Sequence, residues 1–240
     1  MICMSAAEPQ IGECWYLEQI NIFEGLSDED LLEIAKLATR AQYPRDAVIY
    51  SPEDEAGSIY LLEEGKVKLS KVANDGKEIT IAVLQGGDVF GELSMSDDET
   101  YDVFAEVLED ARVCIISRDD FAELVRRKPE VALMLIRSMS ERLRQAESQI
   151  EDLVFRSVPA RVASLLTKLA EEHGRMGREG ITIDLRLTHQ DIANMVGATR
   201  ETVTNVLNGL RASGIIEIAQ KRVRIVDQDA LRNAAHIDRG

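Results

Sequence analysis

Polar side chains between residues 188 and 208 have the types and spacing that recognise base pairs in double-stranded DNA. Arg200 can donate two hydrogen bonds to O6 and N7 of guanine, and its neighbour Glu201 can accept one from N4 of cytosine. Thr188 and Gln190 can hydrogen-bond to backbone phosphates, and contacts of this kind fix the register of a protein on DNA. The segment therefore predicts sequence-specific binding to double-stranded DNA.

Two short helices are needed to present these side chains. Thr188 and Thr199 are suited to cap them, and Gly197 permits the sharp turn between them. Apolar residues recur at helical spacing and form the predicted inward face, which comprises Ile192, Ala193, Val196, Val203, Val206, Leu207 and Leu210. This pattern is typical of a helix-turn-helix, whose second helix enters the major groove. A helical module that contacts protein instead of DNA is the alternative.

The residues after these helices predict a hairpin. Residues 215–226 are expected to form two strands that turn at Gln220, with the basic residues Lys221, Arg222 and Arg224 on them. We interpret the hairpin as the wing of a winged helix, lying near phosphate; a solvated hairpin is the alternative. The complete set of predicted DNA-contacting residues is Thr188, Gln190, Thr199, Arg200, Glu201, Thr204, Asn205 and Lys221.

A long helix is predicted from about residue 118 to residue 155, interrupted near Pro129. Along it, apolar residues alternate in steps of four and three from Ala132 to Leu153, while the flanking positions are polar. Such a heptad seam favours pairing with a second copy of the chain over packing on its own domain. The residues expected to form the homodimer are Ile136, Met139, Leu143, Ala146, Ile150 and Leu153.

Short β-type runs occupy the region from Tyr43 to Val113. Turn signals separate them at 54–57, 63–65, 74–76 and 85–88, and this even spacing predicts an antiparallel roll or jelly roll. A helix capped by Ser27 is expected before the roll. The fold class is therefore α+β. Three parts follow: a β-roll effector domain at 17–128, a dimerisation helix at 129–157 and a winged helix-turn-helix at 158–240, in which 174–180 is expected to be a polar loop.

The charge distribution also divides the chain. The formal net charge is −15, but residues 158–240 sum to +2 and residues 1–157 to −17. A polyanion is therefore expected to approach only the C-terminal third. No window approaches 18 uninterrupted apolar residues, and the three cysteines do not suggest a disulfide framework. We expect a cytoplasmic protein that does not bind a membrane.

These motifs together resemble the bacterial cyclic-AMP receptor protein / fumarate-nitrate reduction regulator family. The resemblance covers about residues 17 to 228 and implies a homodimeric transcription factor that contacts RNA polymerase. In nucleotide-responsive members, an arginine and a serine of the roll hold the cyclic phosphate together with the glutamate of a Gly-Glu-Leu motif. The corresponding effector candidates here are Gly91, Glu92, Leu93, Tyr101 and Asp102, so Tyr101 and Asp102 replace the Arg-Ser pair. Asn205 stands where family members place an arginine.

The residues around this position disfavour cyclic AMP. No basic residue lies between Lys77 and Arg112, so a phosphodiester would lack a charge-assisted partner worth about 1.5 to 3 kcal/mol. Ala146 and Glu147 replace the Thr-Ser pair that would face the base. The alternative is a signalling module that binds a cyclic nucleotide or another small ligand through other residues and has protein, not DNA, as its main partner.

Other effectors are compared by the protein side chains that would have to bind them. Haem and an iron-sulfur cluster are disfavoured, because the three histidines lie beyond the roll and three scattered cysteines do not form a cluster site. No metal site is predicted: the acids at 97–102 form a solvated loop by default, with a hard cation as the alternative. Oxidation of Cys3 or Cys14 stays open. Without clustered His and Glu ligands, a jelly-roll enzyme is not expected, so no catalytic residue is predicted. The effector is unknown; a small ligand in an apolar pocket and control by abundance are both open.

Overall fold

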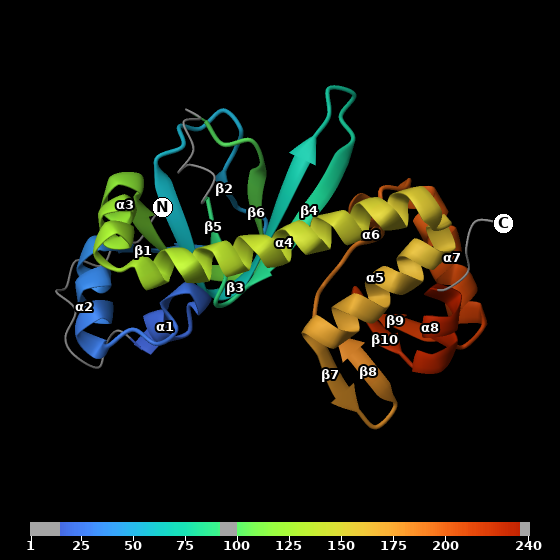
Figure 1. Cartoon of the computed structure of the whole chain (residues 1–240). Coiled ribbons are helices and arrows are strands. Elements are labelled where there is room, and N and C mark those ends of the chain that lie inside the picture. Colours follow the sequence, from blue (N-terminus) through green and yellow to red (C-terminus); the bar gives the residue numbers. More distant parts are fainter. Residues whose placement is uncertain (1–14, 92–99, 236–240) are drawn as a thin grey trace. The chain divides into compact units, whose positions relative to one another are not determined.

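The computed structural model describes residues 15–91 and 100–235, and the chain forms two compact units (Figure 1). The first contains the chain up to Gly76 together with Ile81–Arg144, and the second contains Lys77–Thr80 together with the chain from Gln145. The long predicted helix is therefore shared between them. Cys3, Cys14, Glu92, Leu93 and the acids at 97–99 lie outside the described residues. Within the described ranges, no helix is both long enough and apolar enough to cross a bilayer.

The first unit is built on an antiparallel sheet, which confirms the α+β class with an N-terminal β-roll. Its central pair is β6 next to β3, with β1 and β4 on the outer sides; β2 also pairs with β6, and β5 with β3. The strands are β1 (Thr39–Tyr43), β2 (Val48–Tyr50), β3 (Ser58–Val72), β4 (Glu78–Gln85), β5 (Val89–Phe90) and β6 (Phe104–Ser117).

The predicted turn at 63–65 is wrong, because β3 continues through it from Ser58 to Val72. The pairing of β3 with β6 shifts register at Leu62, Glu64 and Lys66, so these residues form a β-bulge instead of a turn. Gly65 has a φ of +93°, and a Cβ there would lie 2.3 Å from the carbonyl oxygen of Asp110. Glycine is thus required for the bulge, and the sequence signal of a bulge resembles that of a turn.

Alternation along β3 divides the apolar residues of this unit between two cores. Ile59 and Leu61 face a cluster formed with the surrounding helices, whereas Tyr60 and Leu62 face the interior of the roll. Cys114 belongs to the helix-facing cluster and is fully buried. Burial raises the pKa of its thiol, so Cys114 stays protonated.

Helices cover one face of this sheet: α1 (Trp15–Glu18), the 3-10 turn η1 (Asn21–Phe23), α2 (Asp28–Leu37), α3 (Arg118–Arg127) and the start of α4 (Pro129–Phe155). The predicted cap is confirmed, since Ser27 Oγ accepts a hydrogen bond from the Asp30 amide and the Asp30 carboxylate accepts one from the Ser27 amide. The helical stretch from Arg118 to Phe155 is interrupted at Lys128, next to Pro129, as the sequence predicts. Pro129 begins α4, because proline suits the first helical position.

The second unit is a winged helix-turn-helix. Its elements are α5 (Val158–His173), β7 (Gly174–Gly177), β8 (Gly180–Ile183), α6 (His189–Val196), α7 (Arg200–Ala212), β9 (Ile216–Ala219), β10 (Arg222–Ile225) and α8 (Gln228–Ala235), with the sheet order β7-β8-β10-β9.

The predicted polar loop at 174–180 is wrong, because β7 and β8 form a hairpin there. Its edge strand β7 is exposed along its length, so it carries no alternating apolar pattern that would reveal it. The hairpin depends on β8 pairing with β10, which lies far away in the sequence.

Candidate DNA-binding site

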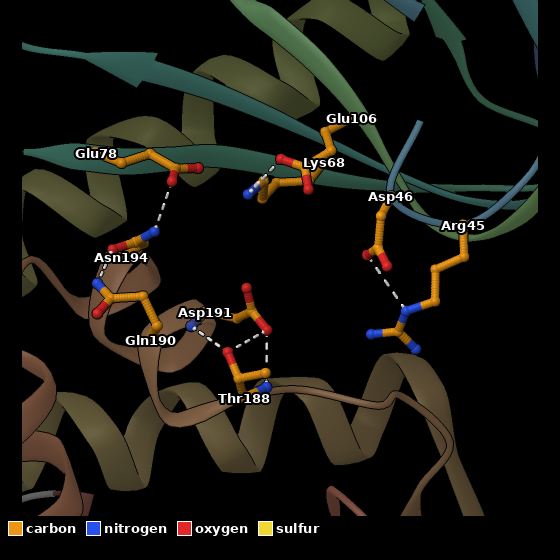
Figure 2. Close-up of polar contacts among 9 residues, drawn as sticks. All are labelled: Arg45, Asp46, Lys68, Glu78, Glu106, Thr188, Gln190, Asp191 and Asn194. Carbon is orange, nitrogen blue, oxygen red and sulfur yellow. Dashed lines mark hydrogen bonds and ion pairs between the residues drawn. The ribbon is translucent and has the colours of Figure 1, made fainter. Parts of the chain in front are cut away.

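The two helices of the predicted motif are α6 and α7, and side-chain caps define where each begins. Thr188 Oγ1 accepts a hydrogen bond from the Asp191 amide at 3.1 Å and donates one to Asp191 Oδ2 at 2.7 Å (Figure 2). Thr199 Oγ1 accepts one from the Thr202 amide at 3.2 Å. Gly197 ends α6 in the left-handed conformation, with a φ of 60°. The caps and the turn agree with the sequence-based prediction.

The two faces of α7 differ as the sequence predicts. Val203 and Leu207 are fully buried against the rest of the unit. The opposite face exposes Arg200, Glu201, Asn205 and Asn208. Among the described residues, Arg200 makes no ion pair, so its guanidinium is available to an incoming ligand.

Two side chains outside the motif hold its turn. Gln149 of α4 donates through Nε2 to the carbonyl oxygen of Met195 at 3.0 Å, and Arg161 of α5 donates through Nη1 to that of Val196 at 2.7 Å. Both carbonyls belong to the last turn of α6, where no helical amide is available to them. Sequence reasoning missed both roles, because a donor that bonds to a distant backbone carbonyl has no local sequence signal.

Side chains that are predicted to contact phosphate already form hydrogen bonds within the motif. The Thr188 hydroxyl gives its proton to Asp191, so it has none left for a phosphate while the cap is intact. Gln190 Nε2 donates to Asn194 Oδ1 at 2.7 Å, which leaves one of its amide protons for DNA (Figure 2). Thr188 and Thr199, which are predicted to contact DNA, therefore act first as helix caps.

Most of the predicted wing charge is neutralised inside the unit. Arg222 forms an ion pair with Asp184 at 3.0 Å, and Arg224 pairs with both Glu217 and Glu179. Lys221 is exposed and makes no ion pair in the described part of the chain. The wing thus presents Lys221 as its free cation.

The turn of the wing is strained. Gln220 and Lys221 connect β9 to β10 as a two-residue hairpin loop, and their φ values are 51° and 63°. Such loops favour Asn-Gly, because positive φ raises the energy of other residues by about 1 kcal/mol or more. Strain of this kind is often found at functional positions.

The effector candidates do not form an anion site in the described part of the roll. Tyr101 is buried and stacks on Tyr50, with ring centroids 3.9 Å apart. Its hydroxyl donates to the carbonyl oxygen of Ser58 at 3.1 Å and accepts from the Ser58 amide at 3.3 Å. Asp102 pairs with Lys71 at 2.9 Å. The two residues that the resemblance aligns with a phosphate-binding Arg-Ser pair are thus an aromatic core residue and a member of a surface ion pair.

The remaining effector candidate with described structure is Gly91. It has a φ of +77°, and a Cβ there would lie 2.8 Å from both the Ser58 carbonyl oxygen and the Tyr60 ring. Gly91 therefore allows β5 to pass close to the aromatic cluster. Among the described residues, no group of three or more His, Cys, Asp or Glu side chains could hold a metal ion.

The helix α4 exposes a row of large apolar side chains on a single chain. Ile136, Leu143 and Ile150 are 58%, 62% and 60% exposed, and Met139 is 40% exposed. Ala146 and Leu153 are half-buried, and a Cβ at Gly197 would lie 2.9 Å from Leu153 Cδ2, so Leu153 packs beside the turn of the motif. The exposed row also includes residues that sequence reasoning left out, namely Leu133, Val154 and Phe155.

Comparisons with known proteins agree with this architecture. Residues 40–128 match the family model of the cyclic nucleotide-binding domain, and residues 160–234 match that of the Crp-like helix-turn-helix domain. The global nitrogen regulator of Synechococcus elongatus is 38% identical over 192 residues, which cover 79% of this chain and 86% of that protein. The CRP-like cAMP-activated global transcriptional regulator of Mycobacterium tuberculosis is 30% identical over 91% of this chain and 98% of that protein.

A solved structure of a regulator from the same family is also similar to this chain. The crystal structure of a CRP-family transcriptional regulator from Thermus thermophilus is 29% identical, with a TM-score of 0.70 over 81% of this chain and 95% of that one. The two family models match the roll and the helix-turn-helix, on either side of α4 in the sequence. The chain therefore belongs to the CRP/FNR family of bacterial DNA-binding transcriptional regulators, as its motifs predict.

Proposed function

We propose that the chain works as a homodimer that binds an inverted-repeat operator through two copies of α7. The observation that carries the proposal is the outer face of α7, where Arg200, Glu201 and Asn205 are exposed above a fully buried apolar face. A recognition helix needs this combination, because its base-reading side chains must be free while the helix itself is held rigidly. We expect the protein to act in the cytoplasm as a regulator that contacts RNA polymerase, without catalysis.

The exposed row of α4 supports the dimer. Leu133, Ile136, Leu143, Ile150 and Val154 are separated by three, seven, seven and four residues, which are spacings of a coiled-coil seam. A contiguous apolar surface of this kind on a water-exposed helix marks a contact with another protein. A two-fold axis would pair the row with itself and place two α7 helices about 34 Å apart, in successive major grooves.

The exposed side chains of α7 suggest the bases that are read. Arg200 would donate to O6 and N7 of a guanine, and Glu201 would accept from N4 of a cytosine. Asn205 suits N6 and N7 of an adenine, where an arginine would prefer guanine. We therefore propose half-sites in which a G·C pair is essential and the consensus of arginine-bearing relatives changes at one base pair.

Selection from random DNA tests this function. Purified full-length protein should enrich an inverted repeat whose half-site centres are one helical turn apart. The enriched half-site should contain the G·C pair assigned to Arg200 and Glu201. Enrichment of no sequence, or of a single half-site without symmetry, would contradict the proposal.

We further propose that the sensor does not use cyclic AMP. The M. tuberculosis relative is named as cAMP-activated, but Tyr101 here lies in an aromatic core with Tyr50, Tyr60 and Phe90. A nucleotide phosphate would have to displace these rings, and the cation beside Asp102, Lys71, is already paired with that carboxylate. The segments 78–91 and 100–111 themselves contain no basic residue. Burial raises the pKa of Tyr60, so its phenol also stays neutral.

Thermal unfolding with cyclic AMP checks the sensor proposal. A ligand at about 100 times its dissociation constant stabilises a protein by about 2.7 kcal/mol, which raises its Tm measurably. We expect no rise in Tm and no change in operator affinity at millimolar cyclic AMP, whereas the M. tuberculosis relative in the same assay is the positive control. A rise in Tm together with tighter operator binding would refute this part of the proposal.

A further inference from the structure

Among the described residues, one side-chain hydrogen bond connects the two helices of the DNA-reading motif. Nδ1 of His189, the first residue of α6, lies 2.8 Å from Oγ1 of Thr204 in α7. Both side chains are half-buried. Thr204 follows Arg200 by one helical turn and precedes the exposed Asn205, so it lies beside the side chains proposed to read bases.

The histidine changes what the Thr204 hydroxyl does. A threonine inside a helix commonly donates to the carbonyl four residues earlier, as Thr167 does to the Ala163 oxygen at 2.9 Å in α5. Thr204 Oγ1 instead has its hydrogen bond with a ring that lies beyond its own helix. The Thr204 hydroxyl is therefore directed to His189 and not to a carbonyl oxygen of α7.

The contact also sets the polarity of the hydroxyl. If His189 Nδ1 accepts the hydroxyl proton, Thr204 can only accept from a ligand, which suits the amino groups of adenine or cytosine. If Nδ1 carries a proton and donates, Thr204 keeps its own proton for O4 of thymine or for N7 and O6 of guanine. One ring nitrogen therefore selects between two classes of base edge.

We propose that His189 is a positioning residue that fixes the rotamer and the hydrogen-bond polarity of Thr204 and thereby determines the preference at one base pair of each half-site. The inference rests on the proposed function, since it needs α7 to lie in the major groove. It assigns to His189 no contact with DNA. The competing interpretation is a structural contact that only holds α6 on α7.

Base preference distinguishes the two interpretations. The variants are His189→Leu and Thr204→Val, which remove the hydrogen bond from either side, the double variant, and His189→Asn, whose side-chain amide occupies the place of Nδ1. Affinities are measured for the selected operator and for every single base-pair substitution in its half-site. The matched control is Thr167→Val, which removes a threonine hydroxyl from a helix of the same unit.

We expect His189→Leu and Thr204→Val to reduce discrimination at the same base pair by about threefold to tenfold, as one hydrogen bond would. The double variant should lose no more than either single variant, because both remove the same interaction. His189→Asn should retain most of the preference, and Thr167→Val should leave all preferences unchanged.

A loss in His189→Leu that is equal for all sequences, or additive losses in the double variant, would overturn the inference. Thr204→Val is isosteric, so it tests the bond even if His189→Leu fails to fold. Wild-type protein without any base preference would overturn the proposed function as well. If the preference that depends on Arg200 persists while His189 affects no single base pair, only the inference about His189 fails.

Discussion

Replacing Arg200 by alanine is expected to weaken operator binding by about 1 to 3 kcal/mol per half-site and to abolish discrimination at one G·C pair. The guanidinium is exposed at the start of α7 and makes no ion pair among the described residues, so the substitution removes a DNA contact without breaking an internal one. Affinities for the operator, for its single-base variants and for random DNA give the measurement. Equal losses on the operator and on random DNA would show that Arg200 reads no base.

Lys221→Gly is the matched control for Arg200, since it also removes one exposed cation from the same unit. A phosphate contact carries no sequence information, so this variant should lose affinity for all sequences alike and reduce the salt dependence of binding. Lys221 has a φ of 63°, which glycine adopts without strain. The Tm of the variant should therefore stay the same or rise while its DNA affinity falls.

Replacing Leu143 by glutamate is expected to dissociate the dimer and to lower operator affinity by about a hundredfold or more. The side chain is 62% exposed in a single chain, so the change should leave the folded monomer intact. In the proposed seam, the two-fold axis would bring both new carboxylates into an apolar interface, where unpaired charge is strongly unfavourable. Each monomer would then hold one half-site without the linked second one, whose benefit is about 10² to 10⁴ in affinity.

Gln145→Glu supplies the control, because it adds the same charge to an exposed position of α4 outside the apolar row. Sedimentation equilibrium and operator titration of both variants give the measurement. We expect a monomer with a native far-UV spectrum for Leu143→Glu and an unchanged dimer for Gln145→Glu. A dimer in both, with equal operator affinity, would show that the subunits meet elsewhere.

The parts of the fold that follow local rules were predictable from the sequence. Ser27, Thr188 and Thr199 cap their helices as expected, because a hydroxyl before an apolar helical repeat satisfies free amides within three residues. The buried and exposed faces of α7 also follow from residue spacing alone. Helical periodicity thus sufficed to locate the exposed face of α7, which we propose reads DNA.

The parts that depend on distant partners were not predictable. The sequence predicts a turn at Gly65 where the structure has a bulge, because only the approach of Asp110 distinguishes the two. The sequence places Arg222 and Arg224 on the wing but does not reveal that acids from other segments neutralise them. Leu153 fits the heptad spacing but packs beside Gly197, because the end of α4 also contacts the turn between α6 and α7.

The hydrogen bond from Gln149 to the last turn of α6 joins the end of α4 to the reading motif within one unit. In a symmetric pair, a rotation of one α4 relative to the other would therefore also rotate the α6–α7 motif that is bonded to it. The number of base pairs that the protein tolerates between half-sites would thus depend on α4 side chains that do not contact DNA. The spacing of half-sites in a genome would then evolve together with the packing of this helix pair.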